Sequence, residues 1–161
     1  MAPPRSSILE LFDLESSLGF LVYKAHQRSF AEFRRELDAV RLTPPQFGVL
    51  ALLHNQNSQS QTTLCDRGAV DPNTMVGIVD RLEAAGLVCR GCDARDRRAH
   101  CVQITPRGRR IFERCLPFQH AATERCWGGL SLTERTRLRN LLRKALRSWQ
   151  PQYGREARNH E

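Results

Sequence analysis

The stretch that decides the fold runs from residue 60 to residue 105 and reads SQTTLCDRGAVDPNTMVGIVDRLEAAGLVCRGCDARDRRAHCVQIT. Two short helical segments are joined by a turn at Gly68 and Ala69, and two strand segments follow, joined by an arginine-rich loop. Ser60 and Asp71 carry side chains that cap helix N-termini. The order helix, turn, helix, strand, basic loop, strand predicts a winged helix-turn-helix, a module that places its second helix in the DNA major groove.

Further helical segments lie on both sides of this stretch. Apolar residues at helical spacing predict a long helix from about residue 16 to residue 40. A capping-box pattern at Thr43 opens a short buried helix, and a loop is expected at residues 55–58. Another long helix begins after Thr105, and a second capping box at Ser131 opens the last helix. The predicted fold class is therefore mainly α with a small β-hairpin wing.

The length of 161 residues predicts a single domain. Its parts are a winged helix-turn-helix core at 43–105, N- and C-terminal dimerisation helices at 1–40 and 106–150, and a loose tail at 151–161. The outer helices carry more apolar face than a small domain buries alone, which predicts a homodimer. Two symmetry-related reading helices about one DNA turn apart favour a pseudo-palindromic operator in double-stranded DNA.

The charge of the chain favours a polyanionic partner. The net charge is +8, and only two of the 25 basic residues are lysines, Lys24 and Lys144. Eight arginines and only three acidic residues lie between Leu87 and Arg114. Arginine's planar fork suits bidentate contacts to phosphates and bases. An ordinary basic surface is the alternative interpretation of the charge alone.

The sequence lacks the motifs that are typical of membrane proteins, secreted proteins and several classes of enzyme. The chain has no apolar run long enough to span a membrane and no secretory leader, so we expect a cytoplasmic protein with no membrane partner. The six cysteines are then expected to be reduced thiols. Gly-rich phosphate loops, nucleophile elbows and His-Glu-x-x-His motifs do not occur, which argues against an enzyme. We expect no cofactor.

Four motifs in this order resemble the MarR family of bacterial transcriptional regulators. They are LTPPQFGVL at 42–50, SQTTL at 60–64, VDRLEAAGLV at 79–88 and DRRAHCVQITPRGR at 96–109. The resemblance covers about residues 14–147. It implies terminal helices that intertwine across a two-fold axis and a small-molecule pocket between those helices and the DNA-reading part.

The second helix of the core is expected to read DNA bases. We expect its buried face to consist of Val76, Val79 and Leu82. Base contacts are then expected from Asn73, Thr74, Met75 and Gly77. Asn pairs bidentately with adenine and Thr bonds either kind of base edge, although Asn73 as a mere capping residue is the alternative. Many relatives in the family have Thr and Arg at positions 76 and 77, so the operator sequence does not transfer from them.

Phosphate contacts are expected beside these base contacts. The first helix of the core would touch the DNA backbone through Ser60, Gln61 and Thr62, although Ser60 also suits a simple helix cap. Arg81 is placed either to reach a phosphate or to pair with Asp80 or Glu83. The sequence leaves both alternatives open.

The loop between the strands is expected to act as the wing. Arg98 is the first choice for a minor-groove arginine, and the resemblance implies that Asp96 orients it through a salt bridge. Arg95 and Arg97 would meet phosphates. A solvated charged turn is the alternative.

The cysteines of the predicted hairpin suggest two kinds of site, a metal site and a redox-active pair. Cys89 and Cys92 with His100 and Cys101 are zinc-type ligands, but they lie on strands beside an arginine-rich loop, so we expect no metal. A hairpin centred near Arg95 would place Cys89 opposite Cys101, which makes a redox pair the alternative regulatory mechanism.

The remaining candidates concern a small-molecule effector. Ligand contacts are expected from Tyr23, His26, Phe30 and Phe47, although aromatic residues at helical spacing also suit a core. Arg28 or His26 would suit an aromatic acid. The sequence thus predicts a homodimeric, sequence-specific repressor that an effector releases from its operator. The alternatives are a cysteine-based redox-gated regulator on the same fold and a low-specificity architectural DNA-binding protein.

Overall fold

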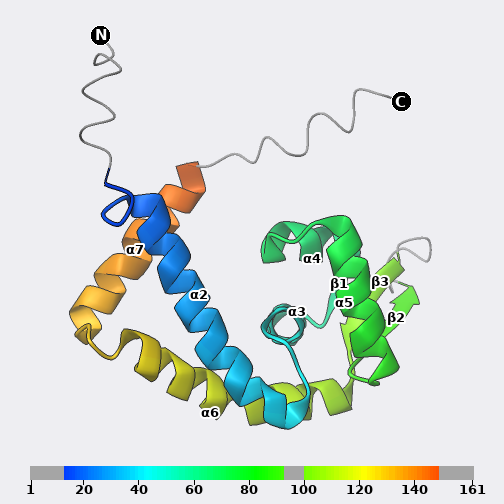
Figure 1. Ribbon diagram of the computed structural model, residues 1–161. Coiled ribbons are helices and arrows are strands. Elements are labelled where there is room, and N and C mark those ends of the chain that lie inside the picture. Colours follow the sequence, from blue (N-terminus) through cyan, green and yellow to red (C-terminus); the bar gives the residue numbers. More distant parts are fainter. Residues whose placement is uncertain (1–12, 93–99, 149–161) are drawn as a thin grey trace, which may run out of the picture. The chain divides into compact units, whose positions relative to one another are not determined.

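The computed structural model describes residues 13–92 and 100–148. Its elements in order are α2 (Leu18–Leu37), the 3₁₀ helix η1 (Asp38–Val40), α3 (Pro44–Asn55), β1 (Ser58–Ser60), α4 (Gln61–Gly68), α5 (Pro72–Ala84), β2 (Val88–Cys92), β3 (His100–Ile104), α6 (Pro106–Trp127) and α7 (Leu132–Ser148) (Figure 1). The predicted mainly helical fold with a small β element is confirmed. The sequence predicted one domain, and the chain divides into two compact units, Met1–Cys126 and Trp127–Glu161.

Polar side chains fix the helix starts in the first unit. Thr43 and Gln46 form a reciprocal capping box at the start of α3. Ser60 Oγ accepts the N–H of Thr63 at 3.1 Å at the start of α4. Asp71 Oδ1 accepts the N–H of Thr74 at 2.9 Å at the start of α5. Each bond satisfies an amide that the helix itself leaves unpaired, which confirms the predicted boundaries.

The β element is a three-stranded antiparallel sheet of order β1-β3-β2. The sequence predicted only the hairpin of β2 and β3, because the SQS of β1 has no alternating apolar pattern. Ser60 pairs with Cys101, and Gln59 pairs with Val102. The buried Gln59 side chain donates to the carbonyl of Leu52 at 2.7 Å. This bond joins the edge strand to α3.

The core of the first unit lies among α3, α4, α5, the inner face of the sheet and the first half of α6. Aromatic rings cross it: Phe33 meets Phe47 edge-on at 4.9 Å between ring centroids, and Phe47 stacks on Phe112 at 5.2 Å. Gly108 of α6 packs directly on the backbone of Leu87, the residue before β2, so that an added Cβ would lie 2.0 Å from the Leu87 carbonyl oxygen. Close packing of this kind fixes the sheet against α6.

The buried face of α5 differs from the prediction. Met75 is 0% exposed and packs in the core with Ile78, Val79 and Leu82, whereas Val76 is 40% exposed. The predicted face placed Val76 inside and Met75 outside, and both placements are wrong. Residues 75, 78, 79 and 82 follow the i, i+3, i+4, i+7 spacing of one helix face, and the thioether is apolar enough to join it.

The second unit contains α7. Ser131 and Glu134 form the predicted capping box, because the N–H of Ser131 donates to Glu134 Oε2 at 2.8 Å and the N–H of Glu134 donates to Ser131 Oγ at 3.3 Å. Leucines on α7 remain largely exposed, at 79% for Leu132 and 66% for Leu146. Within residues 13–92 and 100–148, no helix combines the length and apolarity that a membrane crossing requires.

Candidate nucleic-acid interface

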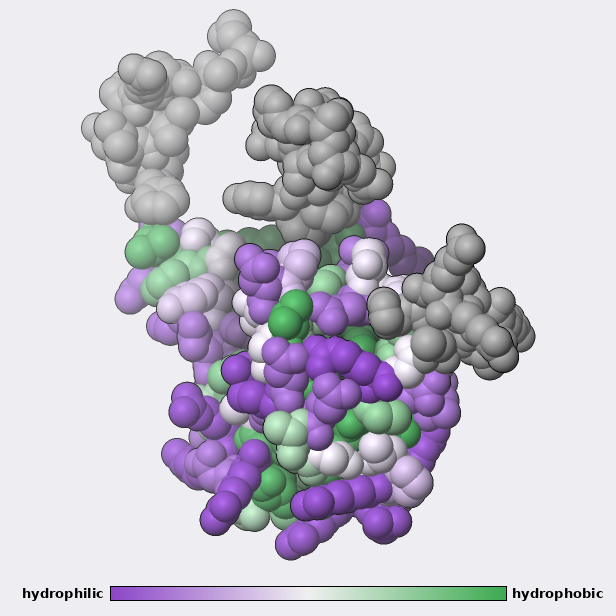
Figure 2. Space-filling model, turned by 90° about the vertical axis from the view of Figure 1, so that its right-hand side faces the viewer, coloured by the Kyte–Doolittle hydropathy of each residue, from purple (hydrophilic) through white to green (hydrophobic). Residues whose placement is uncertain are grey.

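The exposed face of α5 begins with polar residues. Asn73 and Thr74 are exposed in its first turn, and Gly77 and Arg81 continue the same face at helical spacing. The cap bond at this helix start is made by Asp71, and hydrogen bonds from Thr74 lower the pKa of that carboxyl. Figure 2 views the side of the molecule that carries α5, β2 and β3, and hydrophilic side chains predominate on it. The first turn of α5 is therefore open to a polar partner.

Arg90 of β2 braces the far end of α5 through two carboxylates. Its Nη2 lies 2.5 Å from Asp80 Oδ1, and its Nη1 binds Glu83 Oε2. Its backbone N–H also donates to Glu83 Oε1 at 2.9 Å. These hydrogen bonds lower the pKa of Glu83 and raise the pKa of Arg90. The bridge ties the hairpin to α5 and neutralises two negative charges beside the exposed face.

Arg81 does not make the carboxylate pair that the sequence left open. Asp80 and Glu83 both bind Arg90, and no carboxylate among the described residues lies within salt-bridge distance of Arg81. Its guanidinium lies instead over Gly77, with Nη1 3.4 Å from the position that a Cβ on this glycine would take.

The start of α4 offers fewer free groups than the sequence suggested. Ser60 Oγ caps Thr63 and lies 2.8 Å from Thr63 Oγ1, so its hydroxyl is already engaged. Gln61 is half-buried and Thr62 is exposed. The predicted wing residues Arg95, Asp96, Arg97 and Arg98 lie outside the described residues.

The hairpin register corrects the predicted cysteine pairing. Cys89 lies opposite Gln103, and Gly91 lies opposite Cys101. The turn is therefore centred one residue later than expected, which moves every cross-strand partner by two residues. Cys89 is exposed, whereas Cys101 is buried with its thiol 3.4 Å from the carbonyl oxygen of Gly91. No group of metal-ligating side chains occurs in the part of the chain that the structure describes.

A cavity of about 210 Å³ lies between α2 and α6. Its lining consists of His26, Ser29, Phe30, Phe33, Pro44, Gln119, Ala122 and Thr123. The structure thus brings two of the predicted ligand residues, His26 and Phe30, to one cavity, with 5.7 Å between their ring centroids. Tyr23 instead stacks on Phe20, and Phe47 belongs to the aromatic core.

Sequence reasoning missed the contribution of α6 to this cavity. Gln119 Nε2 donates to Thr123 Oγ1 at 3.1 Å, and Thr123 Oγ1 donates to the carbonyl of Gln119 at 2.8 Å. Their i, i+3, i+4 spacing with Ala122 was the available signal. Arg125 follows on the same helix and joins it to α2 through Glu32, 3.0 Å from its Nε, and through Glu36. Hydrogen bonds to these two carboxylates raise the pKa of Arg125.

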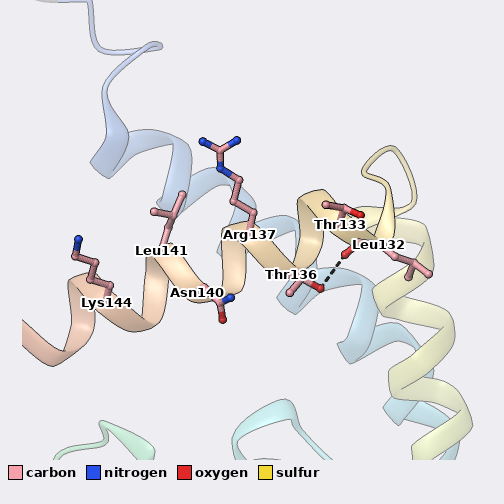
Figure 3. Close-up of a pocket in the computed structure, with 7 residues that line it drawn as sticks. All are labelled: Leu132, Thr133, Thr136, Arg137, Asn140, Leu141 and Lys144. Carbon is pink, nitrogen blue, oxygen red and sulfur yellow. Dashed lines mark hydrogen bonds between the residues drawn. The ribbon is translucent and has the colours of Figure 1, made fainter.

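A larger hollow of about 610 Å³ follows the surface of α7. All of its lining residues belong to that helix, namely Leu132, Thr133, Thr136, Arg137, Asn140, Leu141 and Lys144. Figure 3 shows these side chains pointing to different sides of the helix. One convex helix does not enclose a ligand, so this hollow is open surface, whereas the cavity between α2 and α6 is lined from more than one element.

Comparisons with known proteins agree on one family. The MarR family model matches residues 42–100. The chain is 35% identical over 137 residues to the HTH-type transcriptional repressor NicR of Pseudomonas putida, covering 85% of this chain and 87% of NicR. It is 34% identical to BpsR of Bordetella bronchiseptica, a structure described for the regulation of DNA binding by 6-hydroxynicotinic acid, with a TM-score of 0.77 over 83% of this chain and 96% of BpsR. CouR of Rhodococcus jostii, bound to p-coumaroyl-CoA, is 27% identical, with a TM-score of 0.79 over 86% of this chain and 98% of CouR.

Proposed function

The chain belongs to the MarR family of transcriptional regulators, and from this premise we propose that it is a homodimeric repressor of a pseudo-palindromic DNA operator. The observation that carries the proposal is the exposed polar start of α5, which Asp71 caps and the bridge of Arg90 braces. A helix held in this way presents Asn73 and Thr74 to base edges in the major groove. The basic wing residues would add phosphate contacts.

Exposed apolar side chains support the homodimer. They include Leu18 at 77%, Tyr23 at 56%, Leu132 at 79% and Leu146 at 66% exposed. A soluble monomer seldom leaves so many large apolar groups in water, and a second copy of the chain supplies the matching surface under two-fold symmetry. The dimer then places two α5 helices on neighbouring half-sites.

The cavity between α2 and α6 supports an effector of small aromatic-acid type. Phe30 and Phe33 offer ring faces, and His26 and Ser29 offer hydrogen-bonding groups. A volume of about 210 Å³ suits a single substituted ring. DNA binding by BpsR is regulated by an aromatic acid, and CouR is bound to an aromatic thioester, so relatives of this chain bind ligands of this chemistry. Ligand binding between α2 and α6 would bias the spacing of the two DNA-reading parts.

The first test is a binding titration of the purified full-length protein. The DNA is the intergenic sequence upstream of its own gene, compared with a scrambled duplex at two salt concentrations. We expect a preference of about a thousandfold for the specific site. Equal, steeply salt-dependent affinity for both duplexes would favour the architectural alternative. Adding 6-hydroxynicotinic acid to the specific complex then tests the effector class.

A further inference from the structure

Gly77 and Arg81 lie one turn apart on the exposed face of α5, and the arginine side chain folds back over the glycine. A Cβ on Gly77 would lie 3.4 Å from Nη1, 3.7 Å from Nη2 and 3.9 Å from Cζ of Arg81. The whole guanidinium plane therefore lies beside position 77. It points toward the N-terminal half of α5, as helix side chains generally do.

This guanidinium is also left without a carboxylate partner in the described part of the molecule. Asp80 and Glu83 are the acidic residues nearest to it in sequence, and Arg90 binds both of them. Arg90 therefore keeps Arg81 from being neutralised by its own helix. The arginine fork lies on the face of Asn73 and Gly77, where residue 77 contributes no side chain of its own.

We propose that Gly77 and Arg81 form a guanine-reading pair, in which Arg81 donates two hydrogen bonds to O6 and N7 of one guanine in each half-site. This inference rests on the proposed function. Asn73, Gly77 and Arg81 are spaced i, i+4, i+8 on one face, so the folded-back guanidinium lies beside the turns that reach base edges. A planar fork matches the two acceptors of guanine in the major groove. A Cβ at position 77 would only touch the fork, but the atoms of a longer side chain would compete with it for the same space.

The test measures base preference at every position of the operator. Wild-type protein first selects its site from a randomised duplex library, and each base pair of that site is then replaced in turn. Three variants are compared with wild type. Arg81→Lys keeps the charge but loses the fork, and Arg81→Ala removes both. Gly77→Leu extends a side chain beyond Cβ toward the guanidinium without weakening the helix. Arg35→Lys, at an exposed position of α2 that we assign to no DNA contact, is the matched control.

We expect wild-type protein to lose about tenfold or more in affinity when one particular guanine of the half-site is replaced. Arg81→Lys should remove that preference while preferences at other positions persist. Gly77→Leu should reduce it, and Arg35→Lys should leave it intact. A uniform loss across all sequences with Arg81→Ala, together with a salt slope smaller by about one, would assign Arg81 to a phosphate and overturn the inference. Unchanged preferences in Arg81→Lys would overturn it as well. If wild-type protein selects no site, the proposed function itself fails.

Discussion

Arg90 of β2 binds Asp80 of α5, with 2.5 Å between Nη2 and Oδ1, and the same guanidinium binds Glu83. Both carboxylates lie on the helix that we assign to DNA, so their charge would otherwise repel phosphates. We predict that Arg90→Ala lowers operator affinity by about tenfold while the thermal midpoint changes little, because exposed ion pairs contribute weakly to stability. Titration against operator DNA and a melting curve check the two effects separately.

A compensating variant provides the control. Adding Asp80→Asn and Glu83→Gln to Arg90→Ala removes the uncovered charges, so affinity should recover toward the wild-type value. Failure to recover would mean that the bridge acts by holding the hairpin in place and not by neutralising charge.

The bridge also predicts an acid-sensitive contact at Glu83. Hydrogen bonds from Arg90 lower the pKa of Glu83 below its ordinary value of 4.5. A lowered pKa means that the contact contributes fully above 4.5 and is lost as the pH falls through the lowered value. NMR titration of the Glu83 side chain should therefore give a midpoint below 4.5. In Arg90→Ala the midpoint should rise, and a wild-type midpoint at or above the ordinary value would contradict the bridge in solution.

The close packing of Gly108 on Leu87 leads us to predict that a larger side chain at position 108 destabilises the protein. A Cβ at position 108 would lie 2.0 Å from the Leu87 carbonyl oxygen and 2.9 Å from Ile104 Cγ1, so backbone must move to admit it. We expect Gly108→Ala to lower the free energy of unfolding by about 2 kcal/mol or more. Gly48→Ala in α3 is the matched control, since no neighbouring atom lies within 4 Å of its added Cβ. The control should match or slightly exceed wild-type stability in urea denaturation.

Local signals were enough to predict the helix boundaries. Thr43, Ser60, Asp71 and Ser131 each cap the helix that the sequence assigned to them, because a capping bond joins residues only three positions apart. Chain-distant pairing was harder to predict. β1 exists through its pairing with β3, in which Gln59 lies opposite Val102, 43 residues later in the chain. The SQS sequence of β1 has no strand pattern of its own.

The candidate site shows the same division. Asn73 and Thr74 are exposed as predicted, because the cap at Asp71 fixes where α5 begins. Met75 was misassigned, since thioether chemistry suits both a thymine methyl and a core, and only tertiary packing decides between them. The contact between Arg90 and Asp80 joins β2 to α5, and no short sequence pattern signals such a contact. The predicted centre of the hairpin was wrong by one residue, so the predicted pair of Cys89 and Cys101 was wrong as well.

Met75 and Val76 are neighbours on α5, but only Met75 belongs to the core, so we expect substitutions at the two positions to affect stability differently. Met75 is fully buried, so Met75→Ala should lower the free energy of unfolding by about 2–5 kcal/mol. Val76 is 40% exposed beside the proposed DNA-contacting residues, so Val76→Ala should stay within about 0.5 kcal/mol of wild type. Urea denaturation of the two variants checks this difference. Equal destabilisation by both, or a stable Met75→Ala with altered base preference, would restore the original assignment of Met75 to DNA.

Filling the cavity between α2 and α6 tests whether effector binding is separable from DNA binding. Ala122 lines the cavity and is 4% exposed, so the larger side chain in Ala122→Leu must occupy part of the roughly 210 Å³ available to a ligand. The cavity lies among residues of α2, α3 and α6, none of which we assign to base contacts. We therefore expect operator affinity to stay near wild type while affinity for 6-hydroxynicotinic acid falls by about tenfold or more.

Calorimetric titration with the acid and operator titration with and without it measure the two properties. Ala31→Leu, on the exposed side of α2, should change neither of them. If Ala122→Leu folds as wild type and still binds the acid with unchanged affinity, the effector site lies elsewhere in the molecule.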